Sequence, residues 1–398
     1  MCYHVIELYS NCWIDGKVKV KVMSEVFFTS FKTTMSENLP QKLKRLIKTA
    51  GFEEIDFNDK YAAIKIHFGE LGNLAFLRPN YAKVVADYVK ELGGKPFLTD
   101  CNTLYVGSRK NALDHLDTAY ENGFSPFSTG CHVIIADGLK GTDETIVPVD
   151  GEYVKEAKIG HAIMDADVFI SLTHFKGHEM AGFGGTIKNI GMGCGSRAGK
   201  MEQHCDGKPE VDEDACIGCG ACYRICAHGA PIIKDHGAGR KTARIDHDIC
   251  VGCGRCLAVC PKDAISAVFD DSIAKLNYRM AEYTKAVVDK RPCFHISLIC
   301  DVSPNCDCHA ENDIPVLPDI GMLASFDPVA LDQACADLCN AATVIKDSVL
   351  DEHIHEHPAE AKEHDHFHMI HPDTEWESCL EHAEKIGLGS RKYELKRI

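Results

Sequence analysis

The sequence has little positive charge for its length. Its 398 residues include 43 Lys and Arg against 59 Asp and Glu, which gives a formal net charge of −16. Nucleic acids and anionic membranes are bound through basic side chains, so this balance argues against both as main partners. Long apolar runs are also lacking, because none approaches the roughly 18 residues needed to span a bilayer. We therefore expect no nucleic acid and no membrane among the partners.

The first residues lack the features of an export signal. Residues 1–7 have neither a basic segment nor a long apolar core, and no twin-arginine pair occurs. We therefore expect a cytoplasmic protein. A chain of this length can bury a core large enough to fold without disulfides. The 21 cysteines therefore indicate metal ligation or redox chemistry, as such a density does in a reducing compartment.

Hydrophobic spacing alternates between strand-like and helix-like patterns on both sides of a cysteine-rich centre. The expected strands cover residues 26–31, 61–67, 97–98, 132–136, 167–172 and 294–299. The expected helices cover residues 39–50, 79–92, 111–121, 153–166, 273–289, 328–342 and 376–386. Strands that alternate with helices favour βαβ units and a mainly parallel sheet. We therefore predict an α/β body with flanking helices and one small inserted domain.

These patterns divide the chain into three parts. Residues 1–23 are expected to be an N-terminal extension, residues 24–205 and 271–398 the α/β body, and residues 206–270 the inserted domain. Within the body, residues 353–371 are polar and contain seven histidines. Such a tract suggests transition-metal binding. The alternative, which we favour, is a solvated and partly disordered loop that binds metal only opportunistically.

The inserted domain contains two cysteine runs with the spacing C-x2-C-x2-C-x3-C. The first run is Cys216, Cys219, Cys222 and Cys226, and the second is Cys250, Cys253, Cys256 and Cys260. This spacing holds 4Fe–4S clusters in two-cluster ferredoxins, where the fourth cysteine of each run ligates the other cluster. The predicted ligand sets are therefore Cys216, Cys219, Cys222 and Cys260 for one cluster, and Cys250, Cys253, Cys256 and Cys226 for the other.

Glycines between the cysteines suit this chemistry, because they let the backbone approach a cluster and direct N–H groups at sulfur. They are Gly218, Gly220, Gly252 and Gly254. Pro261 after the last cysteine fits the usual run, whereas Ala227 occupies the matching position in the first run. The alternative is two zinc sites. Zinc normally takes paired C-x2-C units separated by a longer loop, so the spacing favours iron–sulfur clusters.

Several short sequence segments outside the cysteine runs are distinctive when taken together. They occupy residues 65–73, 100–109, 174–178, 182–194, 306–308 and 325–332. From about Ser24 to the C-terminus, the chain resembles the family of iron–sulfur centre proteins catalogued as domain of unknown function 362, with its ferredoxin-type insert. The resemblance implies kinship and two clusters, and it assigns no reaction.

The segment from His174 to His204 is the best active-site candidate. It is rich in glycine and follows a predicted strand, as ligand loops do at the carboxyl ends of parallel strands. Its backbone N–H groups could hold an anion, and Lys176 and Lys188 add positive charge. His174 and His178 could carry protons or bind a metal. The structural alternative is a loop packed against the insert, with lysines that balance the cluster charge.

A second group of cysteines follows the insert. Cys306 and Cys308 form a C-x-C pair, Cys300 precedes them, and Cys194 is a candidate partner through space. Such a pair suits a metal or a redox-active dithiol, and the alternative is a set of buried or idle thiols. Polar residues at or just beyond predicted strand ends could converge on the same cleft, although each alone has a structural explanation. They are His67, Glu70, Asp100, Asn102, Arg109 and Asp137.

The leading hypothesis is a cytoplasmic iron–sulfur oxidoreductase with two 4Fe–4S clusters. In this hypothesis the insert passes electrons to a small anionic or carbonyl-bearing substrate held at residues 174–200. The main alternative is an electron carrier or assembly factor whose body binds a partner protein, the electron donor or acceptor. A third is metal trafficking through the histidine tract.

Overall fold

The computed structural model describes residues 23–104, 107–205, 208–267 and 273–398. The N-terminal extension predicted for residues 1–23 lies outside these ranges, apart from its last residue. No helix in the described ranges is long and apolar enough to cross a membrane.

An eight-stranded sheet forms the centre of the body, with the strand order β16-β1-β15-β14-β7-β2-β3-β4. Its strands are β1 (Ser24–Ser30), β2 (Tyr61–Lys65), β3 (Lys95–Asp100), β4 (His132–Ile135), β7 (Val168–His174), β14 (Cys293–Ile299), β15 (Gly321–Ser325) and β16 (Tyr393–Arg397). Only β15 runs antiparallel to its neighbours in this sheet, and all other pairs are parallel. The predicted α/β body with a mainly parallel sheet is therefore confirmed.

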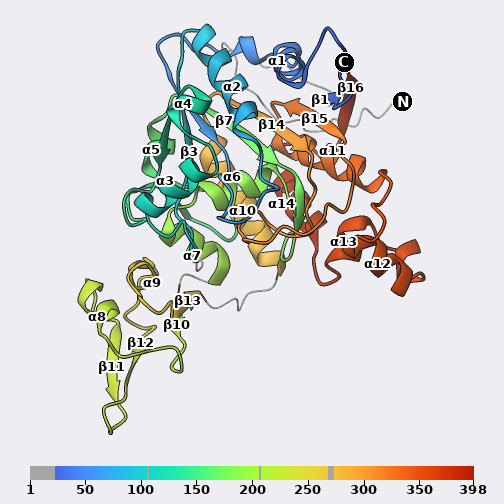
Figure 1. Cartoon of the computed structure of the whole chain (residues 1–398). Helices are drawn as coiled ribbons and strands as arrows, with labels where there is room; N and C mark the ends of the chain where they lie inside the picture. The colour runs from blue at the N-terminus through green and yellow to red at the C-terminus, as the bar shows by residue number, and fades with distance from the viewer. Residues whose placement is uncertain (1–22, 105–106, 206–207, 268–272) are drawn as a thin grey trace, which may run out of the picture.

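Two apolar cores cover the two faces of the sheet. On β7, Val168 and Ile170 belong to one core and Phe169 to the other, and every residue of the strand is buried. This continuous pattern is typical of parallel strands buried on both faces. The first core includes α1 (Leu39–Thr49), α2 (Pro79–Glu91) and α3 (Ala112–Glu121). The second includes α6 (Thr186–Cys194), α10 (Ile273–Val288), α11 (Pro328–Asn340) and α14 (Trp376–Lys385), and α6 and α10 pack side by side (Figure 1).

Helix α1 shows how the local sequence determines an element. The Asn38 side chain accepts a hydrogen bond from Gln41 N at 3.0 Å, and Gln41 Oε1 accepts one from Asn38 N at 2.9 Å. This reciprocal pair satisfies backbone N–H groups that a helix start leaves without partners. Gly51 follows the helix in the left-handed conformation that ends it, as the sequence predicted.

The helix predicted for residues 153–166 is largely replaced by a strand. β6 (Glu156–Gly160) pairs antiparallel with β5 (Glu144–Pro148), and only the short α5 (His161–Asp165) is helical. Ala157 and Ile159 of β6 are buried while Glu156 is exposed, so the segment has the alternation of a strand. Pairing with a neighbouring strand therefore overrides the helical spacing that we inferred.

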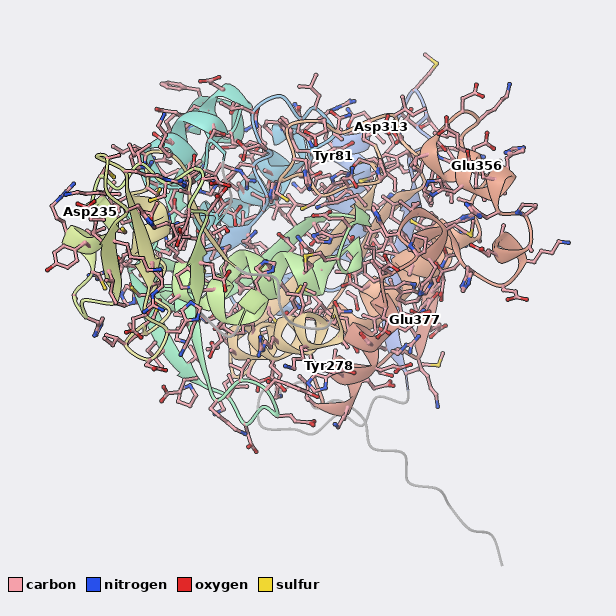
Figure 2. All side chains as sticks on the ribbon, turned by 90° about the horizontal axis from the view of Figure 1, so that it is seen from below. Tyr81, Asp235, Tyr278, Asp313, Glu356 and Glu377 are labelled. Atoms are coloured by element: carbon pink, nitrogen blue, oxygen red, sulfur yellow. The ribbon has the colours of Figure 1, made fainter. Side chains whose placement is uncertain are left out.

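The insert is a small lobe of the described residues 208–267. It contains β10 (Pro209–Val211), α8 (Ala221–Ile225), β11 (Pro231–Asp235), β12 (Lys241–Ile245), α9 (Arg255–Ala258) and β13 (Ile265–Ala267). β10 pairs with β13, which brings the two ends of the lobe together beside the body. Asp235 on β11 and Glu356 lie at opposite ends of the molecule (Figure 2).

The histidine tract differs from the expected loop. Its residues belong to α12 (Val349–Glu356), the 3-10 helix η2 (Glu360–Lys362) and α13 (His366–Ile370). The Phe367 ring lies 5.4 Å from the Phe183 ring and 5.9 Å from the Phe175 ring, centroid to centroid. Met369 and Ile370 are also buried. Burial of these apolar residues orders the segment, and the seven histidines concealed that pattern in the sequence.

Candidate functional site

A largely buried group of polar and charged residues lies beyond the carboxyl ends of β2, β3 and β7. We call it the polar centre, and it consists of Lys65, His67, Glu70, Asp100, Arg109, His174, Lys176, His178, Lys188, Cys306 and Asp307. The last residues of three neighbouring strands, Lys65, Asp100 and His174, belong to it. Ligands of open α/β sheets bind at this edge. The polar centre is therefore the candidate functional site.

Asp307 is the anion at the middle of the centre. It is fully buried, and its carboxylate lies 2.9 Å from His174 Nδ1 and 3.1 Å from Lys176 Nζ. Burial would raise the pKa of Asp307, but the nearby charges of His174 and Lys176 lower it below its usual value. The other ring nitrogen of His174 lies 2.7 Å from the Cys300 carbonyl oxygen. Both neighbours are hydrogen-bond acceptors, so each ring nitrogen of His174 faces an oxygen.

Arg109 organises the edge of the centre next to β2. Its Nε donates to Glu70 Oε2 at 2.9 Å, and its Nη1 lies 2.9 Å from His67 Nε2. Burial, followed by the charge of Arg109, lowers the pKa of His67 well below its usual value. The sequence named these three residues as candidates at strand ends, and the structure brings them into contact. It also joins Asn102 to Asp137, whose Oδ1 accepts from the Asn102 amide at 2.8 Å.

Cys306 is the thiol of the centre. Lys188 Nζ donates to its Sγ at 3.4 Å. The Cys308 thiol lowers the pKa of Cys306 by donating a hydrogen bond, and Lys188 and His178 lower it further against the effect of burial. Burial would lower the pKa of Lys188, but the two neighbouring thiols raise it above its usual value. The Lys188 ammonium thus lies in a part-buried contact with a thiol whose lowered pKa favours the thiolate.

The other two thiols of the proposed extra site have different surroundings. Cys300 belongs to the core formed with α1 and α2, and burial raises the pKa of its thiol. Cys194 is buried on the opposite face, where its carbonyl oxygen accepts from Cys101 Sγ at 3.4 Å. The structure therefore brings together Cys306 and Cys308 but not Cys194 or Cys300.

The glycine-rich segment is not the loop that we expected. It forms a hairpin of β8 (Lys176–His178) and β9 (Gly182–Gly184), then α6 and α7 (Arg197–Cys205). The carboxylate of Asp332 accepts from Thr186 N at 2.6 Å and Ile187 N at 2.9 Å, so it already occupies the start of α6. A Cβ on Gly191 would lie 2.2 Å from the Met280 carbonyl oxygen. This glycine permits close helix packing, and we find no support here for a backbone anion cradle.

Several residues of the site were missed by the sequence analysis. Lys65 is the last residue of β2, and its Nζ lies 3.1 Å from Asp100 Oδ1. Asp307 stands between the two cysteines of the C-x-C pair, and nothing in its sequence position marks it as a site residue. Lys200 and His204 were not missed, because both lie in the candidate segment 174–204, and the structure places them on α7. Burial and nearby cations, Lys188 first, lower the pKa of His204 to about 3. The signal that was available is position, because Lys65 lies near the carboxyl end of the strand predicted for residues 61–67.

The insert holds its eight cysteines in two groups, and none of the described cysteines is in a disulfide. The first group lines a hollow with about 340 Å³ of empty space, together with Pro261. Its thiols are Cys216, Cys219, Cys222 and Cys260. Cys216 Sγ accepts from Ala243 N at 3.3 Å. Gly218 and Gly220 have φ of +62° and +70°, which a residue with a side chain rarely adopts.

The second group is Cys226, Cys250, Cys253 and Cys256. Burial raises the pKa of Cys250, and the neighbouring charges of Cys253 and Cys226 raise it further. Burial, then Cys250 and Cys253, raise the pKa of Cys256 to about 12. Cys222 of the first run acts on Cys256 in the same way, so these effects alone do not separate the groups. The lining of the hollow does place Cys260, from the second run, with Cys216, Cys219 and Cys222 of the first.

Helix α7 connects the insert to the polar centre. Met201 packs with Leu257 and Cys222 of the insert, and a Cβ on Gly254 would lie 2.7 Å from Arg197 Cγ. Lys200 and His204 of the same helix act electrostatically with groups of the polar centre. Residues three and four apart share a helix face, so Arg197, Lys200, Met201 and His204 lie along one face of α7.

Comparison with known proteins adds three partial similarities. A thylakoid-associated protein from Synechocystis sp. is 28% identical over 123 residues, which is 31% of this chain and 34% of that protein. The lactate racemase apoprotein from Thermoanaerobacterium thermosaccharolyticum has a TM-score of 0.39 at 10% identity, covering 76% of this chain and 56% of that one. A structural-genomics target from Thermotoga maritima gives a TM-score of 0.39 at 13% identity, covering 74% and 57%. The chain thus spans about a third of its curated relative and little more than half of each solved structure.

Over most of its length, the chain matches one family model. The match extends from residue 62 to residue 337, so it includes the polar centre and both cysteine runs. The chain therefore belongs to the family described as Domain of unknown function (DUF362).

Proposed function

We propose that this protein is an iron–sulfur oxidoreductase that binds two 4Fe–4S clusters in the insert. One observation carries the proposal: Cys260 of the second run lines the same hollow as Cys216, Cys219 and Cys222 of the first run. This exchange is the ligand pattern of two-cluster ferredoxins.

The donor groups of the insert fit such clusters. Cys216, Cys219, Cys222 and Cys260 would hold one cluster around their shared hollow, and Cys250, Cys253, Cys256 and Cys226 would hold the other. Backbone N–H groups point at sulfur in both groups, from Ala243 to Cys216 Sγ and from Gly252 to Cys250 Sγ at 3.5 Å. Hydrogen bonds of this kind tune the reduction potential of a cluster. When bound, the clusters would supply single electrons.

The polar centre would supply protons and hold the substrate. Lys188 Nζ stores a proton beside the Cys306 thiolate, and His174 holds one between Asp307 and the Cys300 carbonyl. A carbonyl or carboxylate that entered beside them would meet positive charge and a proton donor, which stabilise negative charge developing on oxygen. Helix α7 borders both the centre and the insert. A small anionic or carbonyl-bearing compound is therefore the substrate class we propose.

A second candidate is an electron carrier that docks a partner protein, and one observation favours it. Ile217, Tyr223 and Val251 of the insert are each more than half exposed, and each lies beside a cysteine of the runs. Exposed apolar residues around a redox centre suit contact with an electron donor or acceptor protein.

Metal analysis of anaerobically purified protein tests the proposed cofactor. We expect about eight irons and eight acid-labile sulfides per chain, with absorption that bleaches on reduction by dithionite. Cys219→Ala should remove about four of each, whereas the control Cys131→Ala, a thiol of the body, should leave all eight. Stoichiometric zinc without acid-labile sulfide would contradict the proposal.

The polar centre is tested separately from the clusters. Lys188→Met should abolish reduction of small anionic or carbonyl acceptors by the dithionite-reduced protein, while its iron and sulfide content stays unchanged. Full reduction of such acceptors by this variant would favour the electron-carrier function instead.

A further inference from the structure

The loop of residues 305–309 presents its side chains to two different sites. Asp307 points to His174 and Lys176 in the polar centre. The next two residues, Cys308 and His309, approach Glu179, which follows strand β8. These three side chains therefore form a separate group at the rim of the centre.

The three side chains are close enough to bind one ion. One ligand atom from each of Cys308, His309 and Glu179 lies within 4.8 Å of the other two. His309 Nε2 lies 3.2 Å from Glu179 Oε1. The second carboxylate oxygen, Glu179 Oε2, is buried and has no hydrogen-bond partner in the structure. A buried carboxylate oxygen normally has a partner, so Glu179 Oε2 is available to a bound ion.

The backbone around this group is fixed before any ion binds. Gly177 N donates to Ser303 O at 2.9 Å, and a Cβ on Gly177 would lie 2.2 Å from the Pro304 carbonyl oxygen. This close approach holds the segment of Glu179 against the loop of residues 305–309. On the other side, Asn73 Nδ2 donates to His309 O at 3.0 Å. Ligands that are held in position lose little entropy when they bind a metal.

A second group of possible ligands makes a useful comparison. Asp365, His368 and Glu377 also lie within reach of one ion. There, however, Asp365 accepts hydrogen bonds from Phe367 N, His368 N and Trp376 Nε1, so its carboxylate already has a structural role. That group also lacks a thiol. It therefore needs no ion to explain it, in contrast to the group around Cys308.

We propose that Cys308, His309 and Glu179 bind a single divalent transition-metal ion of the zinc class. A thiolate, an imidazole and a carboxylate are the three donor types that zinc takes in proteins. Two negative ligands balance the charge of the ion. Cys306, next to Cys308, remains paired with the Lys188 ammonium and is not required as a ligand. Three protein ligands leave a fourth position for water or a small molecule at the partly exposed side of Glu179 and His309.

Zinc binding by the full-length, cluster-loaded protein tests this site. The protein is treated anaerobically with a mild chelator, given two equivalents of Zn²⁺, desalted and analysed for zinc, iron and sulfide. We expect about one retained zinc per chain. Its X-ray absorption edge, which iron does not obscure, should report one sulfur at about 2.3 Å and nitrogen or oxygen at about 2.0–2.2 Å.

Variants then assign the ligands. Cys308→Ser and Glu179→Gln should each weaken zinc binding by more than the roughly 10- to 100-fold that is typical when a residue that only hydrogen-bonds a metal ligand is lost. Glu179 is partly exposed, so its variant should keep the fold. The matched control His355→Ala lies on the exposed side of α12 and should retain the zinc of the wild type.

Three results would overturn the site, namely no retained zinc in the wild type, undiminished binding in both ligand variants, or a zinc shell without sulfur. A shell of four sulfurs with lowered iron would place the ion in the insert and would also overturn it. Iron and sulfide are measured on the same sample, so failure of the cluster proposal is recognised independently.

Discussion

Replacing Asp307 by asparagine should destabilise the protein by about 3–5 kcal/mol. The carboxylate is fully buried, 3.1 Å from Lys176 Nζ and 2.9 Å from His174 Nδ1. At 3.1 Å, one such attraction amounts to about 5 kcal/mol with an effective dielectric constant of about 20. The asparagine side chain would preserve the shape and remove the charge, which leaves a buried ammonium without a counter-ion. Breaking a buried pair in this way typically costs about 3–5 kcal/mol.

A double-mutant cycle isolates the pair from the packing around it. Lys176→Met should lower the free energy of unfolding by a similar amount. The loss in the double variant should be at least about 2 kcal/mol smaller than the sum of the two single losses. The measurement is urea unfolding at pH 7, followed by circular dichroism under anaerobic conditions. Additive losses, or a loss below about 1 kcal/mol for Asp307→Asn, would refute the assignment of a charged, coupled pair.

The same pair predicts a pH dependence. The folded protein holds the pKa of Asp307 below its value in the unfolded chain, which is about 3.9. A carboxyl with a lowered pKa contributes stability above the unfolded value, and this contribution is lost as the pH falls through the folded value. The difference between the wild type and Asp307→Asn should therefore be constant near neutral pH and shrink below about pH 4. A difference that grows on acidification would contradict the charged state.

Two further predictions concern other parts of the body. Phe367→Ala should lower the free energy of unfolding by about 3–5 kcal/mol in urea unfolding, because its ring is fully buried against Phe183. The control His355→Ala should change it by less than about 0.5 kcal/mol. Equal effects of the two substitutions would indicate that the tract is a solvated loop. Burial raises the pKa of Asp137 to about 6, despite Lys200 nearby. A carboxyl with a raised pKa destabilises the folded protein increasingly as the pH rises from about 4 to 6. The free energy of unfolding of Asp137→Asn, relative to the wild type, should therefore increase by up to about 3 kcal/mol across that window and stay constant above it. A flat difference from about pH 4 to 7 would disprove this.

The fold was largely predictable because its elements carry local signals. Asn38 and Gly51 delimit α1, and the strand expected for residues 167–172 overlaps β7. The segment of α6 and α7 was not predictable, because its glycines weaken helix propensity. Gly191 is there because the Met280 backbone of α10 approaches it closely, and only the tertiary structure shows this approach.

The candidate site was predictable in its membership more than in its arrangement. Strand ends marked His67 and Asp100, and the sequence alone singled out His174 and Lys188. It could not show that Asp307 joins His174 to Lys176, since the partners lie about 130 positions apart in the chain. It also grouped Cys300 with Cys306, because proximity in sequence carries no information about the face of the sheet on which a side chain lies.

Helix α7 links two parts of the molecule mechanically. Its nine residues span about 13 Å as one rigid rod, with Met201 in contact with the insert and His204 toward the polar centre. A displacement that repacks Met201 must carry His204 with it, since a helix of this length does not bend without a break in its hydrogen bonds. The contact between the insert and Met201 is therefore coupled to the electrostatic environment of Lys188, so a change in either one alters the other.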